Sequence, residues 1–472
     1  MQNDNKIGVF SLVGIIVGAI VGAGIFNLMK EMANNASPGA AVIGWILTGI
    51  GMGTLAFSMV SLNRTHPHLE AGVFSYARAG FGKYIGFYSV WGYWVSNMIG
   101  NVAYATLMFN ALSYFIPSLE NGQNIISIIG ASIVLWMINM LILRGINEAA
   151  VLNAIVMLAK LVPLVLFIVV VGFAFNSEIF FSNIWGTHDG SFSWSEVYPQ
   201  IRKSMLVTVW VFIGVEGAVI FSSRARRKSD VGKATIISFI SVAAIYIAIT
   251  LLSYGIFTQA QLSKMENPAM AYILEAIIGK PGAWIVNAGV VIAIFGAWLA
   301  NTMLGEEIVY QASVQKLFPP IFGNENKRGV PLNATIITNS IIQLIMVSIL
   351  FTTEGYSVLS QLSAAVILFS YTCVALFQLK VQIKYALEGK VTFGPLLIGI
   401  VSSLYMIWLC YASGFNYFVL TMLSLCPGTL VYIYAQRKYK EQIFTKYEIV
   451  IAIISVALFI YGAYSFPTLV NL

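Results

Sequence analysis

Apolar runs of about twenty residues, separated by short polar segments, recur along the whole chain. Thirteen such runs lie at about 8–29, 40–62, 84–115, 125–143, 149–176, 204–222, 234–257, 282–312, 333–353, 357–379, 393–412, 415–436 and 447–468. A helix of about 20 apolar residues crosses a hydrocarbon core of roughly 30 Å, so each run is a candidate membrane span. The pattern predicts an all-α, polytopic membrane helix bundle with 12–13 spans.

The composition agrees with a membrane location. Only 10% of the residues are charged and 58% are hydrophobic, whereas a soluble domain has about 25% charged residues. Cys373, Cys410 and Cys426 all fall inside apolar runs, so we predict no disulfide framework, zinc cluster or redox motif. The polar N-terminus is short and the apolar run after it is too long for a cleaved signal peptide. We expect no metal and no cofactor.

The net charge of +7 is distributed unevenly. If the N-terminus lies in the cytoplasm, most of the 26 lysines and arginines fall in cytoplasmic loops, as the positive-inside rule requires. The basic cluster at 224–233 directly follows a span, so we interpret it as a topology determinant that contacts membrane lipid rather than nucleic acid. Thirteen spans would place the C-terminus outside, although the last span rests on hydropathy alone.

Glycine clusters interrupt two of the predicted spans. The first span contains Gly18, Gly22 and Gly24, and the sixth contains Gly214 and Gly217. Close helix packing would explain any one of these glycines. Two clusters five spans apart instead indicate broken helices that form the substrate site of a transporter. The N-terminus of a half-helix exposes N–H groups and a partial positive charge, so a substrate with a carboxylate is expected.

Ionisable residues within the spans are Lys160, Glu216, Glu306 and Glu307. Each costs about 2.5–3.5 kcal/mol to insert, so a function or a partner is expected. For Lys160, an ion pair that only positions helices is an equal alternative. Neighbouring helical residues point about 100° apart, so at most one of Glu306 and Glu307 can face a pathway and the other should be buried against a neighbour. No nucleophile or metal-ligand set accompanies these carboxylates, so we do not expect an enzyme.

Several motifs resemble those of the amino acid–polyamine–organocation superfamily, and within it the basic amino acid/polyamine antiporter family. They are Gly22–Phe26, Trp210–Gly217, Leu69–Lys83, Gly92–Asn101, Leu143–Ala150 and Ser229–Thr235. The resemblance is specific as far as about residue 300 and looser beyond it. It implies a LeuT-type fold in one transporter domain over residues 1–472. Two inverted five-helix repeats would occupy about 8–176 and 204–379, and accessory helices about 393–468.

The resemblance also implies a function. Members of this family exchange a cationic amino acid, of the arginine, histidine or lysine type, for a metabolic product such as ornithine or a decarboxylated amine. Exchange takes place by alternating access in the prokaryotic plasma membrane. A homodimer is common among such carriers. Two alternatives stay open: a proton-coupled symporter or uniporter, in which Lys160 or Glu216 titrates, and an amino acid sensor that does not transport.

Roles for individual residues follow from the same resemblance. The backbone of Gly22, Ala23 and Gly24 would meet the substrate carboxylate, and that of Ile213 and Gly214 the α-amino group. Further substrate-binding positions are Tyr93, Ser96, Asn97, Asn101, Trp210 and Ser363. Lys160 resembles a lysine that replaces a sodium ion and holds carbonyls of the first helix. Glu216 resembles a gating carboxylate, with Glu306 and Glu307 as further gating or coupling candidates.

One position departs from arginine-binding relatives. Counting back without gaps from Leu317–Pro320, Asn301 occupies the place of their eighth-helix tryptophan, and Trp298 lies about one turn earlier. A tryptophan face would hold a guanidinium by a cation–π contact of roughly 0.5–2 kcal/mol, whereas Asn301 offers hydrogen bonds. Either a local shift places Trp298 in the pocket, or the specificity differs from that for arginine. Histidine with histamine, or lysine with its amine, would suit such a pocket equally well.

Overall fold

A computed structural model describes residues 9–69, 72–145, 149–216, 228–351, 355–390 and 392–469. Its α-helices are α1 (Val9–Ile20), α2 (Leu28–Asn35), α3 (Pro38–Thr65), α4 (Val73–Phe81), α5 (Lys83–Ser113), α6 (Ile125–Leu143), α7 (Ala149–Ala174), α8 (Ser177–Phe181), α9 (Trp194–Phe212), α11 (Lys228–Ser253), α12 (Gln259–Ser263), α13 (Ala269–Ile278), α14 (Lys280–Val314), α15 (Leu332–Ser348), α16 (Gly355–Leu387), α17 (Phe393–Ala412), α18 (Gly414–Leu425), α19 (Gly428–Tyr439) and α20 (Lys446–Leu469). No strand is present within these ranges. The predicted all-α helix bundle is confirmed.

Nine helical segments of the described chain are long and apolar enough to cross a membrane. They are α3, α6, α11, α14, α15, α16, α17, the pair α18–α19, and α20. Large apolar side chains such as Phe173 and Leu344 are exposed on the outside of the bundle. In a membrane protein such residues face lipid, so their exposure is expected. The chain is therefore a multi-pass membrane protein.

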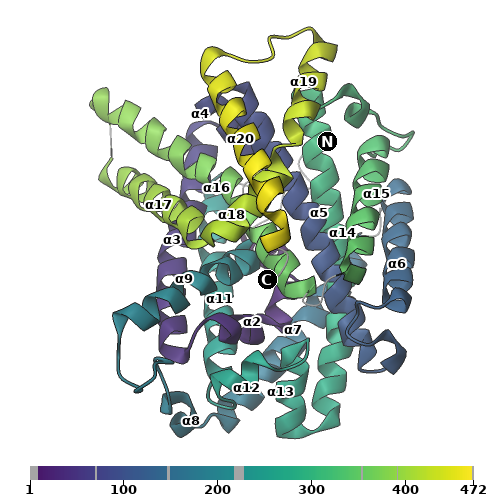
Figure 1. Ribbon diagram of the computed structural model, residues 1–472, viewed down its shortest axis with the longest axis vertical. Coiled ribbons are helices and arrows are strands. Elements are labelled where there is room, and N and C mark those ends of the chain that lie inside the picture. The colour runs from purple at the N-terminus through teal and green to yellow at the C-terminus, as the bar shows by residue number, and fades with distance from the viewer. Residues whose placement is uncertain are drawn as a thin grey trace.

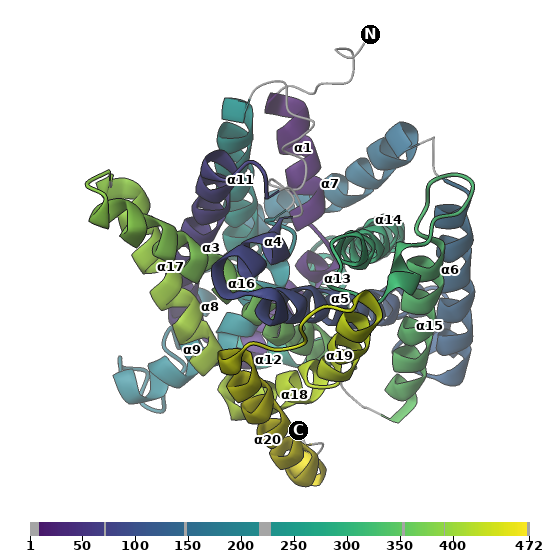
Figure 2. The ribbon, with the colours of Figure 1, turned by 90° about the horizontal axis from the view of Figure 1, so that it is seen from above.

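Helices α5, α14 and α16 form the centre of the molecule. α5 is buried along most of its length and packs against both α14 and α16. Seen from above, α6 and α15 flank this centre on one side and α17 on the other, while α20 lies at the periphery (Figure 2). In side view the long axes of α5 and α14 run along the height of the bundle (Figure 1). The arrangement gives a rigid central layer against which the interrupted helices pack.

The first predicted span is broken, as its glycines indicate. α1 ends at Ile20, a 3₁₀ turn η1 occupies Ala23–Phe26, and α2 continues from Leu28. Gly22 separates the pieces in an extended conformation. In the sixth predicted span α9 ends at Phe212, and Gly214 follows with a φ of +106°, a value that strongly favours glycine. Gly217 and the basic residues at 224–227 lie outside the described residues.

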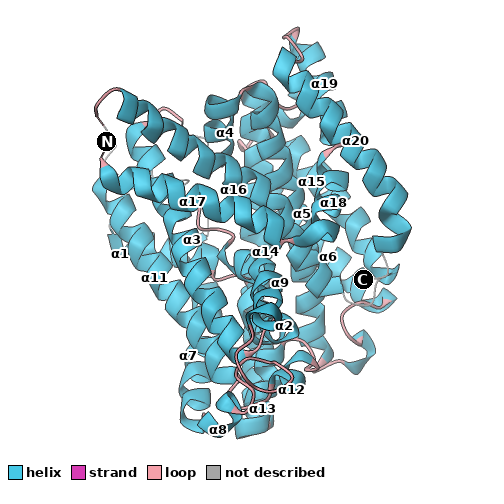
Figure 3. Cartoon of the chain, turned by 60° about the vertical axis from the view of Figure 1, so that its left-hand side comes forward, coloured by secondary structure: helices cyan, strands magenta, loops and turns pink. Residues whose placement is uncertain are grey.

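Some predicted bounds were wrong, and some helices were not predicted. α9 begins ten residues before the predicted start at 204, because its first turns carry polar residues such as Glu196 and Lys203 and are not apolar. The run at 415–436 is two helices, since Pro427 lacks an N–H group and interrupts the backbone ladder. Polar connections also contain helices, α4, α12 and α13, where hydropathy indicated loops (Figure 3). The thirteenth run forms α20 close to its predicted bounds.

Candidate functional site

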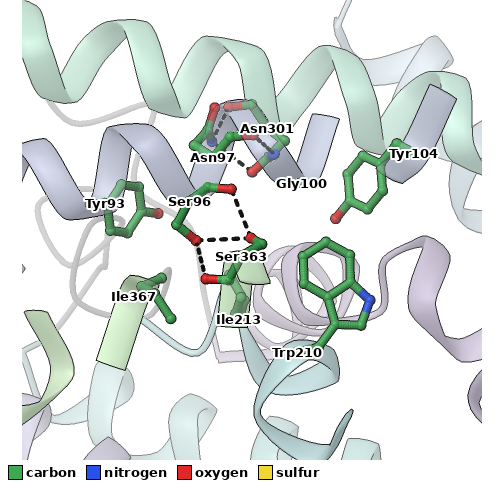
Figure 4. A pocket seen from close by; sticks show the side chains of 10 residues that line it. All are labelled: Tyr93, Ser96, Asn97, Gly100, Tyr104, Trp210, Ile213, Asn301, Ser363 and Ile367. Atoms are coloured by element: carbon green, nitrogen blue, oxygen red, sulfur yellow. Dashed lines mark hydrogen bonds between the residues drawn. The ribbon is translucent and has the colours of Figure 1, made fainter. Parts of the chain in front are cut away.

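A cavity lies where α5, α14 and α16 meet the end of α9 (Figure 4). Its lining residues are Tyr93, Ser96, Asn97, Gly100, Tyr104, Trp210, Ile213, Asn301, Ser363 and Ile367. None of these ten residues is charged. Aromatic and aliphatic groups with a few convergent polar atoms are typical of sites for small ligands.

Two glycines at the first-helix break face aromatic residues of this cavity. A Cβ atom at Gly24 would lie 2.7 Å from Nε1 of Trp210, and one at Gly22 would lie 2.9 Å from the hydroxyl of Tyr104. Any larger residue would therefore displace a lining side chain. Ala23 and Gly24 are the first residues of η1, so their N–H groups cannot bond within that turn. The break thus brings backbone donors next to Trp210 and Tyr104.

The break after α9 is held by a buried carboxylate. Glu216 is only 1% exposed and accepts hydrogen bonds from the hydroxyls of Tyr93 (2.8 Å) and Tyr371 (2.7 Å). It also accepts one from the backbone N–H of Gly214 (3.1 Å). Glu216 does not line the cavity but lies behind Tyr93, which does. One carboxylate therefore links the α9 break to α5 and α16.

Carbonyl groups at the ends of α1 and α9 have polar partners on neighbouring helices. Lys160 of α7, a buried residue, donates from Nζ to the carbonyl of Gly18 at 2.9 Å. The hydroxyl of Tyr246 on α11 lies 3.0 Å from the carbonyl of Ile20 and 2.9 Å from that of Val211. Its single proton can serve one carbonyl at a time. A cation and a hydroxyl thus offset the negative ends of both half-helices.

Asparagine side chains connect α5 and α14 along one wall of the cavity. Asn97 donates from Nδ2 to the backbone oxygen (2.7 Å) and side-chain oxygen (2.8 Å) of Asn301. Asn301 in turn donates from Nδ2 to Oδ1 of Asn101 (2.9 Å). The Nδ2 of Asn101 donates to the hydroxyl of Thr302 (3.2 Å). A Cβ atom at Gly305 would lie 2.3 Å from Oδ1 of Asn97, so this glycine allows the two helices to approach. These amide nitrogens are all engaged within the protein.

The structure places Asn301 in the cavity wall, whereas Trp298 is fully buried and is not a lining residue. Counting back without gaps from Leu317–Pro320 therefore identifies the residue that lines the cavity, which is Asn301 and not Trp298. On the opposite helix, Ser363 exchanges hydrogen bonds with Ser96. The Ser96 hydroxyl lies 2.8 Å from the Ser363 carbonyl, and the Ser363 hydroxyl donates to the Ser96 carbonyl at 2.7 Å. Asn101 supports the wall from behind and is not itself a lining residue.

The two carboxylates of α14 lie away from the cavity. Glu306 is buried between α14 and α15, where it accepts hydrogen bonds from Thr335 (2.8 Å) and Asn339 (3.3 Å). Glu307 is exposed and accepts a hydrogen bond from Gln311 (2.6 Å). One carboxylate is thus buried against a neighbouring helix, as expected. Neither of them reaches the cavity lining.

Four residues at or near the site were not predicted from the sequence. Gly100, Tyr104 and Ile367 line the cavity. Their signal was available for α5, because Gly100 and Tyr104 continue the three-to-four-residue spacing that starts at Asn97. Glu31 of α2 is buried, accepting hydrogen bonds from Asn27 (3.0 Å) and Ser357 of α16 (2.8 Å). It escaped notice because the predicted first span ended at residue 29.

The comparisons with known proteins cover nearly the whole chain. The family model described as amino acid permease matches residues 7–416. The chain is 40% identical to an arginine/ornithine antiporter of Pseudomonas aeruginosa, with 98% of each chain covered. It is 38% identical to an arginine/ornithine antiporter of Latilactobacillus sakei, over 93% of this chain and 92% of that one. It is 36% identical to an arginine/agmatine antiporter of Chlamydia caviae, over 99% and 98%.

These matches agree with the six motifs that resemble those of the amino acid–polyamine–organocation superfamily, two of which lie at the helix breaks. They also agree with a cavity that has uncharged walls and lies at the end of α9, where Tyr104 and Trp210 separate it from Gly22 and Gly24 of the first-helix break. A transporter, and not an enzyme, fits both observations. The chain belongs to the amino acid permease family of membrane transporters.

Proposed function

We propose that this protein exchanges a cationic amino acid for its metabolic product across the prokaryotic plasma membrane. The N-terminus would lie in the cytoplasm, and the repeats would span about 8–176 and 204–379. The observation that carries the proposal is the cavity at the α9 break, whose lining residues Tyr104 and Trp210 contact the first-helix break. Relatives named as arginine/ornithine and arginine/agmatine antiporters support arginine as one substrate, with ornithine or agmatine as the exchanged product.

Hydrogen-bond donors and acceptors are separated across the cavity. On the wall of Asn97, Asn301, Ser96 and Ser363, the N–H and O–H groups bond within the protein. The oxygen atoms of this wall keep lone pairs that can accept further bonds. A substrate end that faces the wall must bring N–H donors. A guanidinium, an ammonium or an imidazole N–H meets this requirement, and a carboxylate does not.

The opposite side of the cavity carries donors. The buried Nε1 of Trp210 has no hydrogen-bond partner within the described residues and lies beside Gly24. The backbone N–H groups of Ala23 and Gly24 are close by. A carboxylate accepts hydrogen bonds and offers none when ionised. A carboxylate at the first-helix break and a cationic side chain at the asparagine wall would therefore satisfy both sides.

Alternating access requires one gate on each side of the cavity. On each side, a hydroxyl group of α16 bonds to a buried carboxylate. Tyr371 lies eight residues beyond Ser363, about 12 Å along the helix, and holds Glu216. Ser357 lies six residues before Ser363, about 9 Å in the other direction, and holds Glu31. Each interrupted helix thus supplies one buried carboxylate. Opening either side would break one of these carboxylate–hydroxyl contacts.

Coupling would need no sodium ion. The ammonium group of Lys160 donates a hydrogen bond to the carbonyl of Gly18 near the first break, and it would repel a second cation at that carbonyl. The outward gradient of the product would then drive uptake. Proton coupling is the second candidate, because deprotonation of Lys160 would release the same carbonyl. Within the described residues, the hydrogen bond of this buried lysine to Gly18 is the contact that deprotonation would weaken.

Counterflow in proteoliposomes tests the proposal. Vesicles that contain the purified protein are loaded with unlabelled ornithine, agmatine, histamine or cadaverine. Uptake of radiolabelled arginine, histidine or lysine from outside is then followed. We expect loaded vesicles to take up one labelled amino acid many times faster than empty vesicles. Equal uptake into empty vesicles would refute exchange, and loss of uptake on addition of a proton uncoupler would favour the proton-coupled alternative.

A further inference from the structure

Tyr104 presents a hydroxyl group to the cavity without a protein partner. The residue lies on α5 and lines the cavity, and its hydroxyl points toward the interior above Trp210 (Figure 4). The two rings are 5.8 Å apart at a tilt of 57°. Within the described residues, no hydrogen bond joins this hydroxyl to another protein group. A tyrosine hydroxyl in a buried setting normally has a partner, so a ligand is the expected one.

The other hydroxyls of the lining behave differently. Tyr93 donates to Glu216, and Ser96 and Ser363 donate to each other's helices. Their positions are therefore fixed by the protein itself. Tyr104 is the lining residue whose hydroxyl proton is not committed among the described contacts. This difference separates a group that shapes the wall from a group that can bind a solute.

The position of the hydroxyl indicates which part of a substrate it meets. A Cβ atom built on Gly22 would lie 2.9 Å from the Tyr104 oxygen, so this oxygen directly faces the first-helix break. Nε1 of Trp210, a buried atom, faces the neighbouring Gly24 in the same way. Both side-chain donors therefore lie at the corner where Tyr104 and Trp210 meet the backbone of the first-helix break. Such a corner suits a carboxylate, which carries only acceptor oxygens.

We propose that Tyr104 is a substrate-binding residue whose hydroxyl donates a hydrogen bond to the substrate carboxylate. The assignment rests on the proposed function, in which the carboxylate lies at the first-helix break. The Tyr104 hydroxyl increases the preference for a ligand with a carboxylate beyond what the backbone N–H groups alone would give. An amino acid gains the Tyr104 bond, and the amine formed by its decarboxylation does not. Tyr104 therefore favours entry of the amino acid over rebinding of the amine.

The test compares Tyr104→Phe with the unchanged protein for three pairs of ligands: arginine with agmatine, histidine with histamine, and lysine with cadaverine. Affinities are measured by competition against a labelled substrate of the purified, full-length protein. For the transported pair we expect the amino acid to bind about tenfold more weakly to Tyr104→Phe. The amine should bind within about twofold of its original affinity. Unchanged binding of the amine also shows that the variant retains its pocket.

Tyr114→Phe is the matched control, because it removes a hydroxyl from the end of the same helix outside the cavity lining. It should leave both affinities unchanged. An equal loss for amino acid and amine, or no loss for either, would overturn the assignment of Tyr104 while leaving transport intact. If the unchanged protein binds none of the three pairs, the proposed function fails, and the assignment fails with it.

Discussion

Gly24→Ala is a small change whose consequence can be worked out from the contacts at the first-helix break. The added Cβ atom would lie 2.7 Å from Nε1 and 2.9 Å from Cδ1 of Trp210, and 3.1 Å from a methyl group of Val211. The first two separations are shorter than side chains tolerate, so the indole ring must move. The opposite face of the indole ring packs on Gly100, where an added Cβ atom would lie 3.2 Å from the ring. The ring can therefore yield only by entering the cavity.

Overpacking of this kind costs about 1–3 kcal/mol. If this strain raises the free energy of substrate binding by the same amount, the apparent affinity falls by a factor of about 5 to 150. The assay is counterflow of the transported amino acid, from which KM is obtained, together with thermal unfolding of the purified protein. We expect KM to rise at least fivefold for Gly24→Ala.

Gly14→Ala is the control for this prediction. Gly14 lies within α1, and a Cβ atom there would meet no atom within 4 Å. Alanine is a better helix former than glycine, so Gly14→Ala should leave KM unchanged and keep or raise the unfolding temperature. The reasoning is refuted if Gly24→Ala transports with an unchanged KM, since the indole ring would then have moved at no cost to binding.

Three further substitutions have distinct expected outcomes. Asn301→Ala removes the acceptor oxygen that faces the substrate side chain and the amide that donates to Asn101, while Asn97 keeps its bond to the backbone oxygen of residue 301. Arginine and agmatine should therefore both bind more weakly, by about 1–3 kcal/mol in a competition assay, and a loss confined to arginine would contradict this. Lys160→Met leaves the carbonyl of Gly18 without its cation, so the exchange rate in proteoliposomes should fall at least tenfold, and an unchanged rate would exclude Lys160 from holding the break. Tyr246→Phe removes the hydroxyl shared by the ends of α1 and α9, so the unfolding temperature should fall by an amount that corresponds to about 1 kcal/mol, while a rise would argue against the contact.

The bundle could be predicted from hydropathy because lipid leaves a helix few alternatives. The bounds of α6 and α17 were predicted to the residue, since both are uniformly apolar and end at polar segments. The start of α9 could not be found in this way, because its first turns are polar and lie beyond the apolar window. The glycine clusters indicated the first break because a second cluster recurs five spans later; glycine density alone does not identify a break, since α3 contains Gly49, Gly51 and Gly53 and is continuous. Pro427 carried a comparable signal that was not used.

The cavity was harder to predict, because it depends on which face of each helix turns inward. Hydropathy does not separate Glu306 from Glu307 on α14, and both proved to lie away from the cavity. The family motifs indicated positions such as Tyr93 and Trp210, where the chain follows its relatives. They did not include Tyr104, which only the helical spacing after Asn97 could indicate, or Glu31, whose surroundings depend on a neighbour distant in sequence. Glu31, for example, is accommodated by Ser357 of α16.

An experimental structure with an amino acid bound would test the central claim most directly. The protein is reconstituted with the amino acid that gives the fastest counterflow, and the orientation of the bound molecule is determined. We predict carboxylate oxygens within hydrogen-bonding distance of the backbone N–H groups of Ala23 and Gly24, with the hydroxyl of Tyr104 adjacent. We also predict the cationic end against Asn97 and Asn301. A bound amino acid with its carboxylate at the asparagine wall, or a ligand outside this cavity, would contradict this prediction.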